Sequence, residues 1–178
     1  MTLRVSLAVL ALSFAPALAP LAAQAPVADA LRANAMRYGK NLTAAAETMP
    51  ADKYAFKPTP AQMSFADIVV HLNEGNDYLC GLLGSTQPPT RTKVTATGTK
   101  EALIARLKET FAFCDQALAK LDDSKLADEV SMFGSMKMTR AAAQMLTVGD
   151  WADHYSQMAI YLRLNGQLPP TAKPAAKK

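Results

Sequence analysis

The sequence predicts an all-α protein, a four-helix bundle preceded by a cleavable signal peptide. Four long stretches carry apolar residues at helical spacing, and the alternation typical of strands is nearly absent. These stretches cover about 27–48, 64–83, 99–121 and 139–165, and proline or glycine residues separate them. Half of the 178 residues are apolar, which is enough for one domain with a sizeable core.

The first two predicted helices have clear boundary signals. The first presents one apolar face made of Leu31, Ala35, Tyr38, Leu42 and Ala45. Pro50 stops it, because proline lacks the amide that a continuing helix needs. Ser64 and Asp67 have the spacing of a capping box, so the second helix is expected to begin there. It is expected to end near Leu83, with Gly84 as its cap.

The third and fourth predicted helices lie on either side of an irregular segment. Thr99 opens the third helix, whose apolar stripe runs to Leu121. Residues 122–138 are expected to be irregular, with a short extended piece. The fourth helix begins near Thr139 and ends at Asn165, which a glycine and two prolines follow.

Both ends of the chain differ in composition from its body. Arg4 and the apolar run VSLAVLALSFAPALAPLAA have the pattern of a secretory signal peptide, so residues 1–23 are expected to be removed. A retained membrane anchor is the alternative, but two prolines interrupt the run. Residues 24–168 then form the bundle, and residues 169–178 form a disordered tail of proline, alanine and lysine. The mature protein is expected to be periplasmic or secreted.

The net charge of +4 gives no reason to expect a nucleic-acid partner. Without Arg4 and the three lysines of the tail, acidic and basic residues are equal in number, so the body has no basic groove. No later stretch reaches transmembrane length, and stable membrane insertion after processing is not expected. The expected partners are a small-molecule substrate or ligand and a second copy in a homodimer.

The two histidines point to a metal site. Asp150, His154, Gln157 and Tyr161 fall within an arc of roughly 60° on one face of the fourth helix. His71, the other histidine, lies in the second amphipathic stretch. Two imidazoles and a carboxylate from two helices can hold a divalent metal and leave positions open for a substrate. The alternative is that these side chains are ordinary rim residues and that no metal binds.

Four segments resemble the DinB-like family of metal-binding four-helix bundles. They are residues 49–72, 76–84, 111–121 and 153–170, in the order found in the family. The resemblance implies a divalent metal held by one histidine on the second helix and an H-x-x-x-H pair on the last. Those positions are His71, Asp150 and His154, and the sequence departs from the family pattern in having an aspartate at position 150.

The aspartate leaves a chemically reasonable ligand set. Two histidines and one carboxylate suit Zn²⁺, Ni²⁺, Mn²⁺ or Fe²⁺. Around this set, the expected supporting residues are Glu74, Asp153, Gln157 and Tyr161. Of these, Glu74 or Asp153 is expected to orient a ligand or move protons. Tyr161 is also expected to pack in the core, and Trp151 is expected to be a packing anchor.

Cys80 and Cys114 are the only cysteines, and an exported protein with two cysteines favours a disulfide. Antiparallel neighbouring helices would bring them within reach. Two buried thiols that behave as small apolar side chains are the alternative.

Two functions remain open from the sequence. The first is a metal-dependent enzyme, a hydrolase or a thiol transferase as in relatives of the resembled family, acting on an unknown substrate. The second is a non-catalytic bundle without metal, which binds a small molecule or serves in envelope stress. The presence of stoichiometric metal separates the two.

Overall fold

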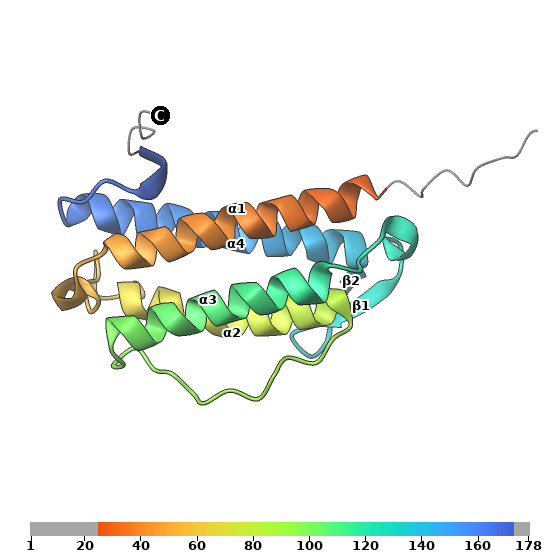
Figure 1. Cartoon of the computed structure of the whole chain (residues 1–178), viewed down its shortest axis with the longest axis horizontal. Coiled ribbons are helices and arrows are strands. Elements are labelled where there is room, and N and C mark those ends of the chain that lie inside the picture. The colour runs from red at the N-terminus through yellow and green to blue at the C-terminus, as the bar shows by residue number, and fades with distance from the viewer. Residues whose placement is uncertain (1–24, 173–178) are drawn as a thin grey trace, which may run out of the picture.

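A computed structural model describes residues 25–172, and the predicted signal peptide lies outside the described residues. Four helices make the body: α1 (Pro26–Thr48), α2 (Phe65–Gly84), α3 (Lys100–Leu118) and α4 (Arg140–Leu164) (Figure 1). Short 3₁₀ turns occupy Ala51–Lys53, Asp123–Lys125 and Pro170–Ala172, and strands β1 (Glu129–Met132) and β2 (Met136–Thr139) pair antiparallel. Among the described residues, no helix is long and apolar enough to cross a membrane.

Helices α2 and α3 run in the same direction, which corrects the antiparallel arrangement expected from the sequence. The Cys80–Cys114 disulfide and the hydrogen bond from Asn76 to Thr110 both join residues 34 positions apart, as a parallel pair requires. The connection 85–99 returns along the bundle to make this possible (Figure 1). Extended, it spans up to about 50 Å, whereas α2 is about 30 Å long.

The predicted helix starts are confirmed. The Ser64 hydroxyl accepts a hydrogen bond from the Asp67 amide at 3.0 Å, and the Asp67 carboxylate accepts from the Ser64 amide at 2.9 Å. This is the reciprocal pairing of a capping box. Thr99 and Thr139 cap α3 and α4 in the same way, through hydroxyls that accept from amides in the first turn.

The expected ends of two helices are corrected. Ser85, with a φ of 50°, is the left-handed residue that ends α2, and Gly84 still belongs to the helix. Gly84 is needed for another reason, because an added Cβ would overlap the Ala117 carbonyl of α3. Helix α3 ends at Leu118 rather than Leu121. The Arg32 side chain of α1 donates hydrogen bonds to the backbone carbonyls of both leucines.

The segment between α3 and α4 contains more regular structure than the predicted short extended piece. Strands β1 and β2 form a hairpin whose tip holds Phe133 and Gly134, both with positive φ. Val130 and Met132 alternate with exposed residues on β1 and reach the core. The hairpin therefore covers one end of the bundle.

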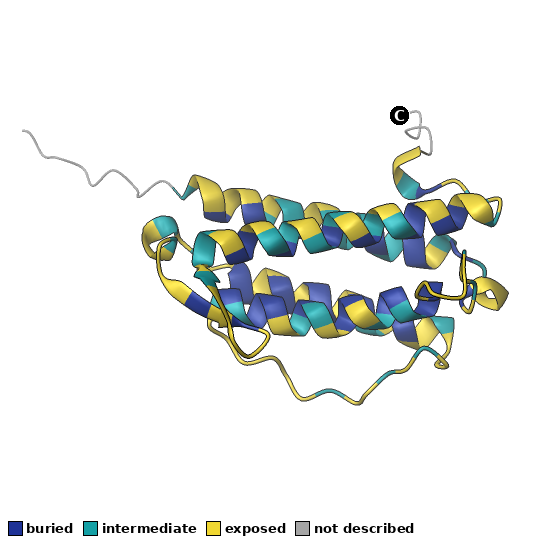
Figure 2. Cartoon of the chain, turned by 180° about the vertical axis from the view of Figure 1, so that it is seen from behind, coloured by how far each residue is buried: buried dark blue, intermediate teal, exposed yellow. Residues whose placement is uncertain are grey.

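The core lies between the four helices, where the buried residues face one another (Figure 2). Trp151 of α4 is fully buried and donates from Nε1 to the Asn76 side-chain oxygen at 2.8 Å. Asn76 also donates to Thr110 of α3 at 3.1 Å. These bonds join three helices, and the predicted role of Trp151 as a packing anchor is confirmed.

The ordered body extends past the predicted boundary at residue 168. Thr171, in the 3₁₀ turn Pro170–Ala172, forms hydrogen bonds through its hydroxyl and amide to the Tyr155 hydroxyl. Pro169 is buried. These contacts hold the first residues of the predicted tail against α4, and residues 173–178 lie outside the described part of the chain.

Gly84→Ala is expected to destabilise the fold, and Gly75→Ala in the same helix is the matched control. The first substitution forces a methyl group against the Ala117 backbone, a kind of overpacking that costs about 1 to 3 kcal/mol. At Gly75 nothing lies within 4 Å of an added Cβ, so alanine should stabilise α2 by about 0.5 to 1 kcal/mol. Urea unfolding measures both, and equal effects would contradict the close approach of α2 to α3.

Reduction of the disulfide is expected to lower the free energy of unfolding by about 3 to 4 kcal/mol, because the bond closes a loop in the unfolded chain. Cys80 and Cys114 are 34 residues apart in sequence, with Cα atoms 5.1 Å apart. Urea unfolding with and without reductant measures the change. The double variant Cys80→Ala, Cys114→Ala is the control and should not respond to reductant.

Candidate metal centre

The structure brings together the three residues that the sequence singled out as ligands. His71 lies two turns into α2, and Asp150 and His154 lie one turn apart on the facing side of α4. Each offers one ligand atom, and these atoms all lie within 4.8 Å of one another. The two helices thus form a cluster of two imidazoles and one carboxylate.

The carboxylate of Asp150 lies close to both imidazole rings. Its Oδ1 atom is 3.3 Å from Nε2 of His154 and 3.7 Å from Nε2 of His71. The rings meet edge to face, with centroids 4.6 Å apart. Both imidazoles therefore turn the same nitrogen toward a common point beside the carboxylate.

The centre is most exposed to solvent at His71. The His71 side chain is 48% exposed, Asp150 is 22% exposed and His154 is 10% exposed. His154 forms the inner wall, and His71 lies at the rim on α2. A small molecule can therefore approach the cluster from the His71 side.

The charges of the cluster depend on one another. Burial alone would raise the pKa of Asp150, but hydrogen bonding and charge interactions with His154 and His71 hold that pKa below its usual value. Hydrogen bonding to Asp150 raises the pKa of His71, burial opposes this, and the charges of Asp150 and Glu74 add to the increase. Asp150 is therefore a carboxylate anion at neutral pH.

The donor set fits a divalent transition metal. Two imidazole nitrogens and one carboxylate oxygen converge from rigid helices, and the anion offsets part of the charge of a cation. Nδ1 of His154 is buried and has no hydrogen-bond partner among the described residues. With Nδ1 enclosed by the core, Nε2 is the nitrogen of His154 that faces the centre. Three protein ligands leave coordination positions open for a substrate.

The four expected supporting residues have other hydrogen-bond partners or none. Asp153 accepts a hydrogen bond from Gln157 at 2.8 Å on the exposed side of α4. Tyr161 donates to the Met63 carbonyl at 2.8 Å and holds the loop before α2. No hydrogen bond in the described part of the chain links Glu74 to the cluster, although its charge acts on His71. These residues surround the centre without contacting its ligands through hydrogen bonds.

Asn76 is a positioning residue that the sequence analysis missed. It is buried one and a half turns after His71 and binds Trp151, the residue next to Asp150. The signal was present, because an asparagine on the apolar face of a helix is expensive to bury unless a partner satisfies it. Its partners lie on other helices, and spacing alone does not reveal them.

Comparisons with known proteins agree with this architecture. The sequence model of the DinB superfamily matches residues 37–158. A DinB-like protein from Bacillus subtilis has 20% sequence identity and a TM-score of 0.63, over 78% of this chain and 92% of that one. A DinB-like protein from Bacillus cereus ATCC 10987 has 12% identity and a TM-score of 0.65, over 80% of this chain and 95% of that one.

A third similar structure is a variant of a mycothiol-dependent maleylpyruvate isomerase, with 11% identity and a TM-score of 0.59. The match covers 74% of this chain and 60% of the isomerase. These likenesses establish a shared fold. No curated protein sequence matches the chain. Because the superfamily model spans more than half of the sequence, the chain belongs to the DinB superfamily.

Proposed function

We propose that the protein is a metal-dependent enzyme whose single divalent transition metal is held by His71, Asp150 and His154. The observation that carries this proposal is the convergence of their ligand atoms within 4.8 Å, with the His71 side open. The ion is Zn²⁺, Ni²⁺, Mn²⁺ or Fe²⁺, the metals that suit a ligand set of two histidines and one carboxylate.

The reaction that this centre supports best is hydrolysis or thiol transfer on a small molecule. When bound, the metal supplies Lewis acidity toward a carbonyl or a thiol. Asp150 and His154 would hold the ion at the inner wall, and the exposed carboxylate of Glu74, whose charge acts on His71, can accept a proton at the rim. The likeness to a mycothiol-dependent isomerase supports thiol chemistry as a candidate.

The second candidate is a bundle that binds a small molecule without metal, as in an envelope-stress protein. The observation in its favour is that Asp150 already pairs with both imidazoles through its own charge. The metal content of the purified protein separates the candidates, since an enzyme of the proposed kind retains about one ion per chain.

We further propose that the protein is exported to the periplasm or secreted. The disulfide between Cys80 and Cys114 supports this location, because such bonds persist in oxidising compartments. Intact-mass measurement of the mature protein tests it. Export predicts a new N-terminus between residues 20 and 26.

Substitutions of the proposed ligands are expected to remove metal binding or to strengthen it, depending on the residue introduced. His154→Ala and Asp150→Ala should each abolish stoichiometric binding, because two remaining ligands hold an ion poorly against water. Asp150→His should bind Zn²⁺ and Ni²⁺ more tightly, because imidazole suits these ions. Gln157→Ala, on the same helix but outside the cluster, is the control. Elemental analysis and titration calorimetry measure the effects, and an unaltered ion content in Asp150→Ala would remove that residue from the ligand set.

Metal affinity is expected to fall as pH decreases, because protons compete for the imidazole nitrogens. The decline should begin above pH 6.5, since Asp150 raises the pKa of His71 above that ordinary value.

In the metal-free protein, the stability from the His71–Asp150 interaction is present in full below pH 6.5 while Asp150 stays ionised. It is lost as pH rises through the folded pKa of His71. NMR titration of His71 in Asp150→Asn should give a lower pKa than in the wild type, and an equal pKa would contradict the coupling.

A further inference from the structure

Phe133, at the tip of the hairpin, has a backbone conformation that is unfavourable for a bulky side chain. Its φ is 48°, in the left-handed region that disfavours bulky residues, and it is 61% exposed. Asparagine or glycine would make the same turn with less strain. Backbone strain of this kind is concentrated at sites that bind ligands. The surroundings of Phe133 are therefore a candidate binding site.

Tyr78 of α2 fixes the position of the Phe133 ring. The two rings stack with centroids 5.2 Å apart and an interplanar angle of 27°. The Phe133 amide also donates a hydrogen bond to the Tyr78 hydroxyl at 2.6 Å. The hairpin tip is therefore attached to α2 through an ordered and largely exposed aromatic pair.

This aromatic pair lies on the same side of α2 as the metal centre. Tyr78 follows His71 by seven residues, which places it two turns along the same helix face and about 10 Å away. Gly75 lies between them, and nothing occupies the space within 4 Å of where its Cβ would be. The path along α2 from His71 to the aromatic pair is therefore not blocked by a side chain at position 75.

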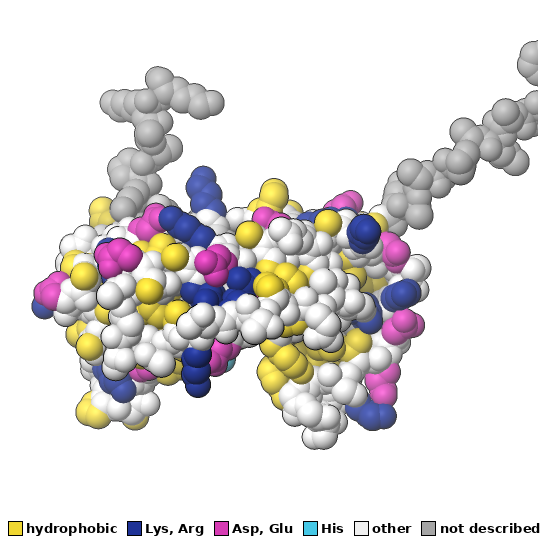
Figure 3. Space-filling model, turned by 60° about the horizontal axis from the view of Figure 1, so that its bottom comes forward, with side chains coloured by type: hydrophobic (Ala, Val, Ile, Leu, Met, Phe, Trp, Pro, Cys, Tyr) yellow, Lys and Arg dark blue, Asp and Glu magenta, His cyan; other side chains and the backbone are white. Residues whose placement is uncertain are grey.

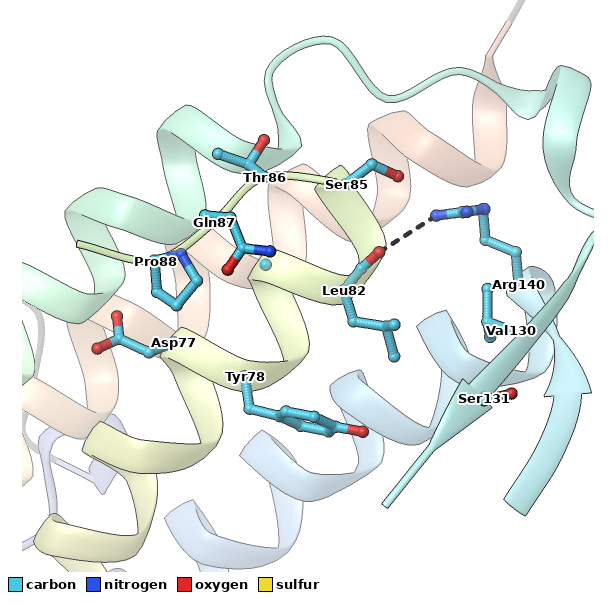
Figure 4. A pocket seen from close by; sticks show the side chains of 11 residues that line it. Asp77, Tyr78, Leu82, Ser85, Thr86, Gln87, Pro88, Val130, Ser131 and Arg140 are labelled. Carbon is cyan, nitrogen blue, oxygen red and sulfur yellow. Dashed lines mark hydrogen bonds between the residues drawn. The ribbon is translucent and has the colours of Figure 1, made fainter. Parts of the chain in front are cut away.

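A cavity of about 580 Å³ continues from Tyr78 along α2 and under the hairpin. Figure 4 shows Tyr78 and Leu82 on its floor, with Val130 of β1 on one side and Gln87 on the other. Its acidic residue, Asp77, is already paired with Arg91 at 2.8 Å. In Figure 3 the surface is notched next to the lobe at the lower right, which the hairpin forms. The guanidinium of Arg140 also lines the cavity and donates to the Leu83 carbonyl at 2.7 Å. The cavity thus offers apolar surface, neutral polar groups and one cation to a ligand.

We propose that the Tyr78–Phe133 pair and this cavity bind the distal part of the substrate of the metal centre. The substrate then carries an aromatic or flat apolar group about 10 Å from the atom that approaches the metal. Such a group would stack on the aromatic pair, and the part of the substrate beyond it would enter the cavity beside Leu82 and Val130. This inference rests on the proposed metal-dependent function and adds the class of substrate.

Hydroxamates, which chelate metal ions at open coordination positions, provide the test. Metal-loaded protein is titrated with hexanohydroxamate, with phenylhexanohydroxamate and with phenylacetohydroxamate. The first two differ only in the ring, and the third holds the ring too close to reach Tyr78. We expect phenylhexanohydroxamate to bind about tenfold more tightly than hexanohydroxamate, and the short phenyl compound to show no such gain.

Phe133→Asn is the decisive variant, with Met136→Ala on the same hairpin as its control. Phe133→Asn should remove the gain from the phenyl ring and leave the affinity for hexanohydroxamate unchanged. Its unfolding midpoint in metal-free protein should be unchanged or higher, because asparagine relieves the strained φ. Met136 is also exposed, and its substitution should preserve the gain.

The outcomes separate this inference from the proposed function. If the protein retains no metal, both are wrong. If hexanohydroxamate binds but the phenyl ring gives no gain, or the gain survives in Phe133→Asn, only the aromatic site is wrong. A lower unfolding midpoint in Phe133→Asn than in Met136→Ala would also reject it, because the ring would then serve the fold.

Discussion

The side chain of Asn76 forms the contacts on which the relative position of His71 and Asp150 depends. Its amide nitrogen donates to Thr110 of α3, and its oxygen accepts from Trp151 of α4. All three groups are buried, so breaking either bond would leave a polar group without a partner, at a cost of about 1 to 3 kcal/mol. The register of α2 against both neighbours is therefore fixed near its middle. Because Asp150 precedes Trp151, that register also determines which residue of α4 faces His71.

The sequence predicted the features that depend on local spacing. The capping box at Ser64 and the four helices follow from residues a few positions apart, and so does the common face of Asp150 and His154. The approach of His71 to that pair was also predicted, because both belong to apolar faces that must meet in one core.

The features that were missed depend on contacts between distant segments. The parallel direction of α2 and α3 follows from the path of the 85–99 connection, which no helix pattern encodes. The position of Gly84 near the end of α2 resembles that of a helix cap. The glycine is needed instead because the Ala117 carbonyl of α3 lies where a Cβ atom would be. Asp153 was expected to play a supporting role at the rim, because adjacent helical residues point about 100° apart, and its carboxylate accepts a hydrogen bond from Gln157.

Helix α2 is held on its two sides by bonds of different kinds. On the α3 side, a covalent disulfide joins Cys80 to Cys114. On the α4 side, the hydrogen bond from Trp151 to Asn76 is joined by contacts between titratable groups, His71 with Asp150 and His154. A change of protonation therefore alters the contacts between α2 and α4, whereas a reductant breaks the covalent bond between α2 and α3. The two helix interfaces of α2 thus contain chemically different groups: one is sensitive to the redox state of the surroundings, and the other is sensitive to their acidity.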